Sequence, residues 1–284
     1  MKQLKNTEKW GQPSRLAGWL LVPLLMLVIW QIAGQHMNKP WLLPTPMRVA
    51  EQLCHPTRIH FNSGSLLSNS LISLLRVLLG FSAAAVIGIL SGLLLGSFKT
   101  LRSLIEPTLE MIRPLCPVVW LPFAIAVFKL KTLPNLFGIR YSHTIFDQVQ
   151  LGMLFVIFIG GFFPIFTNTL DGVLTVRQNF ILLARTLGAS KGQIFYKIAL
   201  PAALPQIVTG LRQGLGMSWF VIMAAEMMVG VQSGIGYLLM YAADNAAMDL
   251  VISCMLIIGG VGAAMMFLMR QSLIHHINWK GREF

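Results

Sequence analysis

Long apolar runs, separated by shorter polar connections, make up most of the chain. A helix needs about 20 apolar residues to cross the hydrocarbon core of a bilayer, and six runs reach or approach that length. They cover about 16–35, 67–96, 103–128, 149–171, 206–229 and 248–269. The pattern therefore predicts an all-α membrane protein with six transmembrane helices.

The second run is rich in small residues. Gly88, Gly92 and Gly96 follow one another at intervals of four, so they lie on one face of a helix. Small residues on one face let two helices approach closely inside a membrane. We expect this face to pack against another span.

The third run contains four prolines, Pro107, Pro114, Pro117 and Pro122. Proline interrupts the hydrogen bonding of a helix, and the freed carbonyls are tolerated at membrane depth only against other helices or a water-lined cavity. We therefore expect this span to be broken and to lie inside the bundle.

Three segments between the runs are predicted to be loops: 36–66, 129–148 and 230–247. The first carries prolines and scattered charges, the second is polar, and the third contains glycine. A longer stretch that does not span, 172–205, separates the fourth run from the fifth.

The composition excludes a soluble enzyme. Only 11% of the residues are charged and 55% are hydrophobic, with a mean hydropathy of +0.69, whereas an ordinary soluble domain carries about 25% charged residues. Three widely spaced cysteines without a CxxC pair argue against a disulfide framework or a structural zinc site.

The net charge of +12 would suit a nucleic acid or an anionic membrane surface. Basic residues precede the first run, which is long and lacks a clean cleavage site, so we predict an uncleaved span with a cytoplasmic N-terminus. Alternating spans then place thirteen cations inside and six outside, which agrees with the positive-inside rule, puts the C-terminus inside and leaves no nucleic-acid surface. The inner cations are Lys2, Lys5, Lys9, Arg15, Lys99, Arg102, Arg177, Arg185, Lys191, Lys197, Arg270, Lys280 and Arg282; the outer ones are Lys39, Arg48, Arg58, Lys129, Lys131 and Arg140.

The stretch 172–205 is predicted to form two short helices joined at a glycine. Apolar spacing indicates a helix over about 177–187 that ends at Gly188, and a second helix over about 190–199 that ends before Pro201. Their apolar side chains could be buried by another protein or could lie on lipid headgroups, and the residue pattern leaves both open. These side chains are Leu183, Leu187, Ile194, Phe195 and Ile198.

Seven residues of this region resemble the cytoplasmic signature loop of bacterial ABC importer permeases, in which Glu-Ala-Ala precedes a glycine and later a Leu-Pro pair. They are Ala184, Gly188, Ala189, Leu200, Pro201, Pro205 and Gly210. The triplet itself reads Leu182-Leu183-Ala184, so the family glutamate and the alanine after it are replaced here.

Three further stretches resemble the nitrate/sulfonate/taurine subfamily of these permeases. They are Leu43-Pro44-Thr45-Pro46, the run from Arg113 to Pro122, and Ala225-Glu226-Met227 with Gly234-Ile235-Gly236-Tyr237. The resemblance extends over about 16–280.

The resemblance implies one permease domain over 1–284 with the fold of a type I ABC importer permease. It also implies a second copy of the chain as a homodimer, two cytoplasmic ATPases that bind ATP-Mg, and an extracytoplasmic binding protein, all at a bacterial cytoplasmic (inner) membrane. This chain has no GxxxxGK[ST] phosphate loop, and we expect it to bind no cofactor. The coupling residues implied for the ATPases are Ala184, Arg185, Leu187, Gly188, Ala189, Phe195, Leu200 and Pro201.

Ionisable residues inside spans are costly and therefore mark candidate functional positions. Arg76, Arg113 and Arg212 could line a path for a small anion, or could pair with a carboxylate such as Glu226. Trp120 could pack in the bundle or line a pore. His143 with Asp147, and His275 with His276, lack further ligands, so no metal site is expected.

The sequence thus predicts the permease of an ATP-driven importer, with no catalytic residues of its own, for a small oxyanion such as nitrate, a sulfonate, taurine or bicarbonate. An aromatic carboxylate or a vitamin precursor is an alternative solute. A secondary transporter or channel would require inverted repeats or a midplane ion site, and an intramembrane enzyme would require a catalytic motif; we find neither.

Overall fold

The computed structural model describes residues 12–37, 39, 41–60, 63–129, 131–138, 145–176, 178–228 and 231–274. Within these ranges all regular secondary structure is helical, apart from two isolated β-bridges. Several residues discussed above lie outside the described residues: Lys2, Lys5, Lys9, Arg140, His143, Arg177, His275, His276, Lys280 and Arg282.

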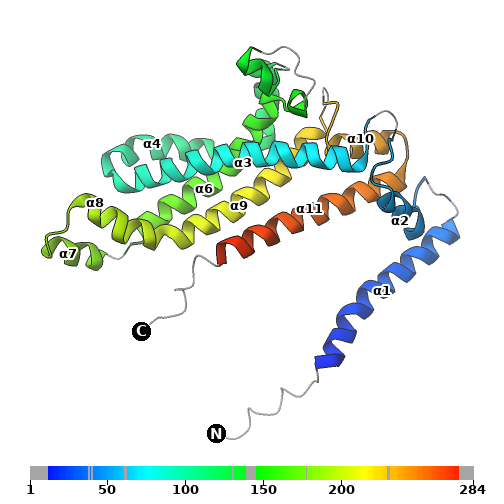
Figure 1. Cartoon of the computed structure of the whole chain (residues 1–284), viewed down its shortest axis with the longest axis horizontal. Coiled ribbons are helices and arrows are strands. Elements are labelled where there is room, and N and C mark those ends of the chain that lie inside the picture. Colours follow the sequence, from blue (N-terminus) through cyan, green and yellow to red (C-terminus); the bar gives the residue numbers. More distant parts are fainter. Residues whose placement is uncertain are drawn as a thin grey trace, which may run out of the picture.

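Figure 1 shows a long bundle whose longest helices, apart from the first, run roughly along one direction. The α-helices are α1 (Gln12–Met37), α2 (Pro46–Cys54), α3 (Leu66–Ser97), α4 (Lys99–Ile112), α5 (Leu121–Phe128), α6 (Leu151–Leu174), α7 (Gln178–Thr186), α8 (Lys191–Ile194), α9 (Leu200–Glu226), α10 (Ile235–Asp244) and α11 (Met248–Ile274). Shorter turns are η1 (Pro117–Trp120), η2 (Leu133–Phe137) and η3 (Ile145–Gln148), which are 3-10, and η4 (Phe195–Ala199), which is a π-helix. We call the two ends of the bundle the α7 end and the α10 end.

Four predicted spans are confirmed as helices that are long and apolar enough to cross a membrane. They are α3, α6, the continuous helical stretch Lys191–Glu226 that ends in α9, and α11. The first predicted span is α1, a helix of 26 residues. In Figure 1 α1 diverges from the bundle, and near its C-terminal end Trp30 donates a hydrogen bond to the carbonyl of Pro44 (3.0 Å).

The third predicted span is broken, as its prolines indicated, but the break is a turn of 91° between α4 and the η1–α5 segment. Pro114 and Pro117 lie in and directly after the segment that joins them, where neither residue can donate a backbone hydrogen bond. The range 103–128 is therefore not one straight crossing helix, and α4 folds back beside α3 while α5 packs on α6.

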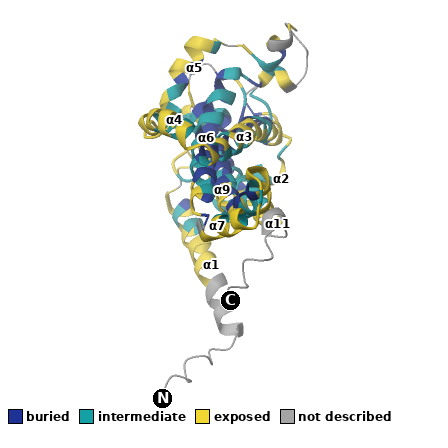
Figure 2. Ribbon diagram, turned by 90° about the vertical axis from the view of Figure 1, so that its left-hand side faces the viewer, coloured by how far each residue is buried: buried dark blue, intermediate teal, exposed yellow. Residues whose placement is uncertain are grey.

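Close helix approach holds the centre of the bundle together. A β-carbon added at Gly88 would lie 3.0 Å from Ile165, one at Gly92 would lie 2.7 Å from Thr169, and one at Gly96 would lie 2.7 Å from Val173. The predicted glycine face is thus confirmed as the α3 surface that packs against α6. The contact positions on α3 and those on α6 both increase by four from one contact to the next, so the two helices run parallel. Figure 2 shows the buried residues along α6 and α9.

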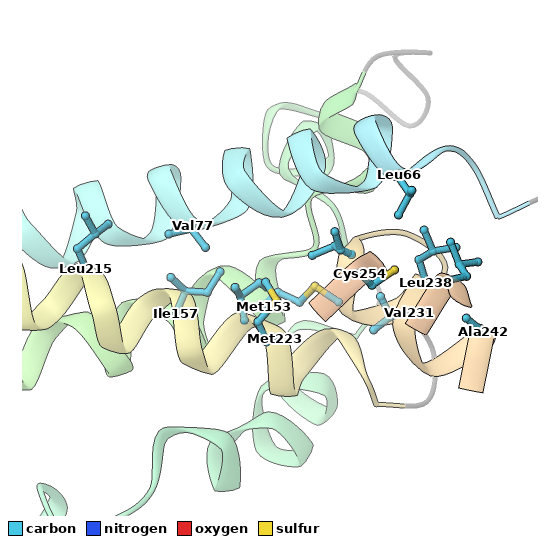
Figure 3. Close-up of a cluster of buried hydrophobic side chains, with 13 residues drawn as sticks. Leu66, Val77, Met153, Ile157, Leu215, Met223, Val231, Leu238, Ala242 and Cys254 are labelled. Carbon is cyan, nitrogen blue, oxygen red and sulfur yellow. The ribbon is translucent and has the colours of Figure 1, made fainter. Parts of the chain in front are cut away.

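A second buried cluster fills the α10 end, as Figure 3 shows. Leu238 and Ala242 of α10 pack there with Leu66 of α3 and Cys254 of α11. The prediction of a loop over 230–247 was wrong, because an apolar face of α10 is buried in this cluster. The residues Ile235, Leu238 and Ala242 are at most 1% exposed.

Candidate functional site

The α7 end of the bundle is a knob made by α7 and the start of the next helix. Gly188 ends α7 with a φ of +78°, a conformation that glycine adopts without strain. Its N–H donates to the carbonyl of Arg185 (3.0 Å), and the N–H of Ala189 donates to that of Ala184 (2.9 Å). These two bonds form a Schellman cap, and they confirm the predicted helix end at Gly188.

The second half of the knob differs from the prediction. Ser190 and Gln193 form a reciprocal capping box that starts the new helix. The helix does not end before Pro201 but continues into α9, so Lys191–Glu226 is one helical stretch. The π-helical turn Phe195–Ala199 precedes the proline, and this wider turn accommodates a residue that cannot donate to the carbonyl four positions earlier.

Apolar side chains on the outside of the knob are largely exposed. Phe180, Leu182 and Leu183 are more than half exposed, and Leu187 is 79% exposed. Leu183 and Leu187 also line a hollow of about 410 Å³ between α7 and the start of α9, with Lys197 at its edge. Of the other predicted coupling residues, Arg185 is exposed, Ala184, Ala189, Phe195, Leu200 and Pro201 are half-buried, and Ile194 of the predicted apolar face is buried instead.

A buried ion pair lies at the opposite end of α9. The Arg76 guanidinium on α3 and the Glu226 carboxylate at the end of α9 are 2.6 Å apart, and their side chains are 1% and 0% exposed. The hydroxyl of Ser73, one turn before Arg76, also donates to this carboxylate (2.7 Å). Of the two roles considered for Arg76, pairing with Glu226 is therefore the one that the geometry displays.

The same ion pair joins three further segments. Arg76 donates to the carbonyl of Gln148 (2.6 Å), which precedes α6, and to the carbonyl and hydroxyl of Ser233 (2.9 and 2.7 Å), which precedes α10. Glu226 accepts from the N–H of Gly236 (3.0 Å), and Ser73 accepts from that of Ile235 (2.9 Å). All hydrogen-bonding positions of a buried charged pair must be filled for it to be tolerated, and these contacts fill many of them.

Asn69 extends this network along α3. Its Oδ1 accepts from the N–H of Gly234 (2.8 Å), and its Nδ2 donates to the carbonyls of Ser63 (2.9 Å) and Ser65 (3.0 Å). Sequence reasoning found Arg76 and Glu226 but missed Asn69 and Ser73. The signal was present, because positions 69, 73 and 76 form a polar stripe on one face of an otherwise apolar helix.

The structure does not bring the other candidate residues to this network. Arg113 is exposed and lines a small hollow of about 60 Å³ with Glu106, Glu110 and Asp171. Arg212 is exposed on α9 and has no ion pair within the described part of the chain. Trp120 packs edge-on against Phe123 and Phe155.

Comparison with known proteins adds a family match and several relatives. A family model described as binding-protein-dependent transport system inner membrane component matches residues 84–273. The chain is 39% identical over 241 residues to a putative ABC transporter permease protein of Methanocaldococcus jannaschii, which covers 85% of this chain and 84% of the relative.

Two cyanobacterial proteins are also similar. The nitrate import permease protein NrtB of Synechocystis is 36% identical over 246 residues, 84% of this chain and 81% of the relative. The bicarbonate transport system permease protein CmpB of Synechococcus elongatus is 35% identical over 279 residues, 92% of this chain and 94% of the relative. Each of these three relatives matches more than four-fifths of this chain.

Proposed function

This chain belongs to the inner-membrane components of binding-protein-dependent transport systems, and we propose that it is the permease through which a small oxyanion is imported. It is a multi-pass membrane protein and a transport subunit of an ABC importer rather than an enzyme. The family implies a separate ATPase and a binding protein as partners. We treat 1–284 as one permease domain.

The exposed knob supports a role as the ATPase docking site and is the observation that carries the mechanism. Exposed apolar side chains such as Leu182 and Leu187 are typical of a surface that a partner protein covers. The cations Arg185, Lys191 and Lys197 surround them, and the sequence contains no Asp or Glu between Gly172 and Ala225, so a partner cleft with carboxylates at its rim fits best. ATP-driven closure of two such ATPases would move the knob and, with it, the continuous helix that ends at Glu226.

The docking role also orients the chain. ATP is hydrolysed in the cytoplasm, so the α7 end lies inside and the α10 end faces the binding protein. Both termini are then cytoplasmic, in agreement with the excess of Lys and Arg on that side.

Two features support a second copy of the chain. The break after α4 leaves irregular, exposed backbone from Arg113 to Cys116, and such backbone is tolerated at membrane depth only against protein or water. On the spanning helices α6 and α9, the amide of Asn168 donates to Gln213 (3.0 Å) at an exposed position, beside exposed Arg212. Lipid is a poor partner for these polar groups, whereas a water-filled path between two copies would solvate them.

The relatives support a small oxyanion as the solute. NrtB is named for nitrate and CmpB for bicarbonate, and both anions are planar and small. An exposed cation such as Arg212 near the inner half of the path would favour an anion over a cation. An aromatic carboxylate remains the second candidate class.

Reconstitution tests this function. Proteoliposomes would contain the chain with its ATPase, the binding protein outside and ATP inside. We expect ATP-dependent uptake of labelled nitrate, bicarbonate or taurine and no uptake from the chain alone. Uptake without the ATPase would contradict the importer, and uptake restricted to benzoate or another aromatic carboxylate would contradict the oxyanion.

A cysteine cross-link tests the second copy. Cys116 is exposed at the break, so a variant that keeps it and replaces Cys54 and Cys254 by alanine should form a covalent dimer with a short bifunctional maleimide in membranes. A variant that keeps only Cys54 is the matched control. Equal cross-linking of both would contradict a specific interface at the break.

A further inference from the structure

The polar stripe of α3 lies at the α10 end of the bundle, where the binding protein would dock and where α9 ends. Asn69, Ser73 and Arg76 occupy successive turns of α3 near the α10 end, and all three are at most 2% exposed. Side chains from this one stripe contact the segment before α10, the segment before α6 and the end of α9. We call these three residues with Glu226 and Ser233 the clasp.

The clasp connects the segment before α6 and the segment before α10 to the end of α9. The segments before α10 and α6 are short connections, and Arg76 grips both through backbone carbonyls, at Ser233 and Gln148. Glu226 is the last residue of α9, and its carboxylate accepts from the N–H of Gly236 in the first turn of α10 (3.0 Å). A side chain at Gly234 would collide with this carboxylate, so the connection is packed as well as hydrogen-bonded.

The opposite end of the same helical stretch is the knob. Lys191–Glu226 contains 36 residues, which corresponds to about 54 Å at 1.5 Å per residue. A continuous helix transmits a displacement along its axis, whereas a chain broken at Pro201 would not. Because the helix continues through Pro201, the knob and the clasp lie at the two ends of one continuous helical stretch.

From this arrangement we propose that the clasp transmits docking of the binding protein at the α10 end to the ATPases at the α7 end. Ser73, Arg76 and Glu226 act as positioning residues, because they hold α10 and the segment before α6 in fixed register with α9. The proposal rests on the importer function above and adds the residues that carry the signal. A coupling between sites of this kind ordinarily changes a response about five- to 150-fold.

A matched pair of serines on α3 tests the clasp. Ser73→Ala removes the hydroxyl that donates to Glu226 and accepts from Ile235. Ser82→Ala on the same helix is the control, because Ser82 is exposed and donates only within the helix, to the carbonyl of Leu78. Ser233→Ala is a second, milder variant that removes one hydrogen bond from Arg76 and keeps the carbonyl contact.

The measurement is ATP hydrolysis by the reconstituted complex with and without the binding protein. For Ser73→Ala and Ser233→Ala we expect the stimulation to fall at least about fivefold, while basal hydrolysis and recovery of the complex stay within about twofold of wild type. Ser82→Ala should match wild type throughout.

Either of two outcomes would overturn the proposal. Undiminished stimulation in both clasp variants would show that the network does not transmit docking. Equal loss of basal and stimulated hydrolysis, or failure of both variants to assemble, would assign the contacts to folding alone. A wild-type complex without any stimulation or uptake would instead contradict the importer function, since the clasp is judged only from the ratio of variant to wild type.

Discussion

Gly92 of α3 and Thr169 of α6 lie so close that a β-carbon on Gly92 would be 2.7 Å from the Cβ of Thr169. Real β-carbons do not approach other carbon atoms to this distance, so the contact requires glycine. Thr169 is fully buried, and neither backbone can retreat without opening the centre of the bundle. This contact sets the spacing of the two parallel helices on which α9 packs.

Gly92→Ala is therefore expected to destabilise the protein by about 1–3 kcal/mol, the usual cost of adding a methyl group to a well-packed core. Gly259→Ala on α11 is the matched control, because a β-carbon there meets nothing within 4 Å. It should gain up to about 1 kcal/mol from helix propensity. Unfolding in mixed micelles titrated with SDS measures both, and equal stabilities for the two variants would contradict the close approach.

Glu226→Leu should cost more, about 3–5 kcal/mol, because it leaves the buried guanidinium of Arg76 without a counter-charge. The control is Glu106→Gln, which breaks the half-buried pair between Glu106 and Arg102 (3.6 Å) and should change stability by less than about 1 kcal/mol, because a longer, partly solvated pair contributes little. The same SDS titration compares them. A loss for Glu226→Leu no larger than that for Glu106→Gln would mean that the buried pair is not formed.

The knob depends on the conformation of Gly188. A β-branched residue is strained at a φ of +78°, whereas asparagine tolerates that region, so Gly188→Val should distort the knob and Gly188→Asn should not. We expect Gly188→Val to lower recovery of the ATPase with the permease at least about tenfold, which corresponds to about 1.4 kcal/mol of binding free energy. Membrane insertion should be unchanged in both variants. Normal ATPase recovery with Gly188→Val would contradict docking at this turn.

His60 gives the protein an expected pH dependence at the α10 end. Burial, assisted by the positive charge of Arg58, lowers the pKa of His60 below its ordinary value, although Asp249 opposes the shift. Its Nε2 has no hydrogen-bond partner within the described residues. The folded protein therefore binds a proton at His60 less readily than the unfolded chain does. The contribution of neutral His60 to the free energy of unfolding is fully present above about pH 6.5 and declines as the pH falls below that value.

Melting temperatures at pH 7.5 and 5.5 check this prediction, with His60→Gln as the control. Wild type should lose more stability than His60→Gln over this interval, because only wild type carries the group that must be protonated against burial. An identical loss in both proteins would show that other groups govern the pH dependence.

Apolar run length was enough to predict the helical class and four of the long helices, because burial in a bilayer requires a minimum number of consecutive apolar residues. The four-residue spacing of Gly88, Gly92 and Gly96 likewise predicted a packing face, and glycine before Ala189 predicted a helix end. These features depend on local composition and short spacing, which a sequence records directly.

The tertiary structure decided which partners these residues meet. As ionisable residues in predicted spans, Arg76, Arg113 and Glu226 were equally good candidates for a functional site. Of these three, only Arg76 and Glu226 lie together. They are 150 positions apart in the sequence, and the packing of α3 on α9 brings them to 2.6 Å. Pro201 predicted the end of a helix, but the π-turn before it lets the helix continue to Glu226. The sequence did not predict α10, because the segment 235–244 is short and lies beside several glycines. This segment is a helix because the cluster around Leu238 buries its apolar face.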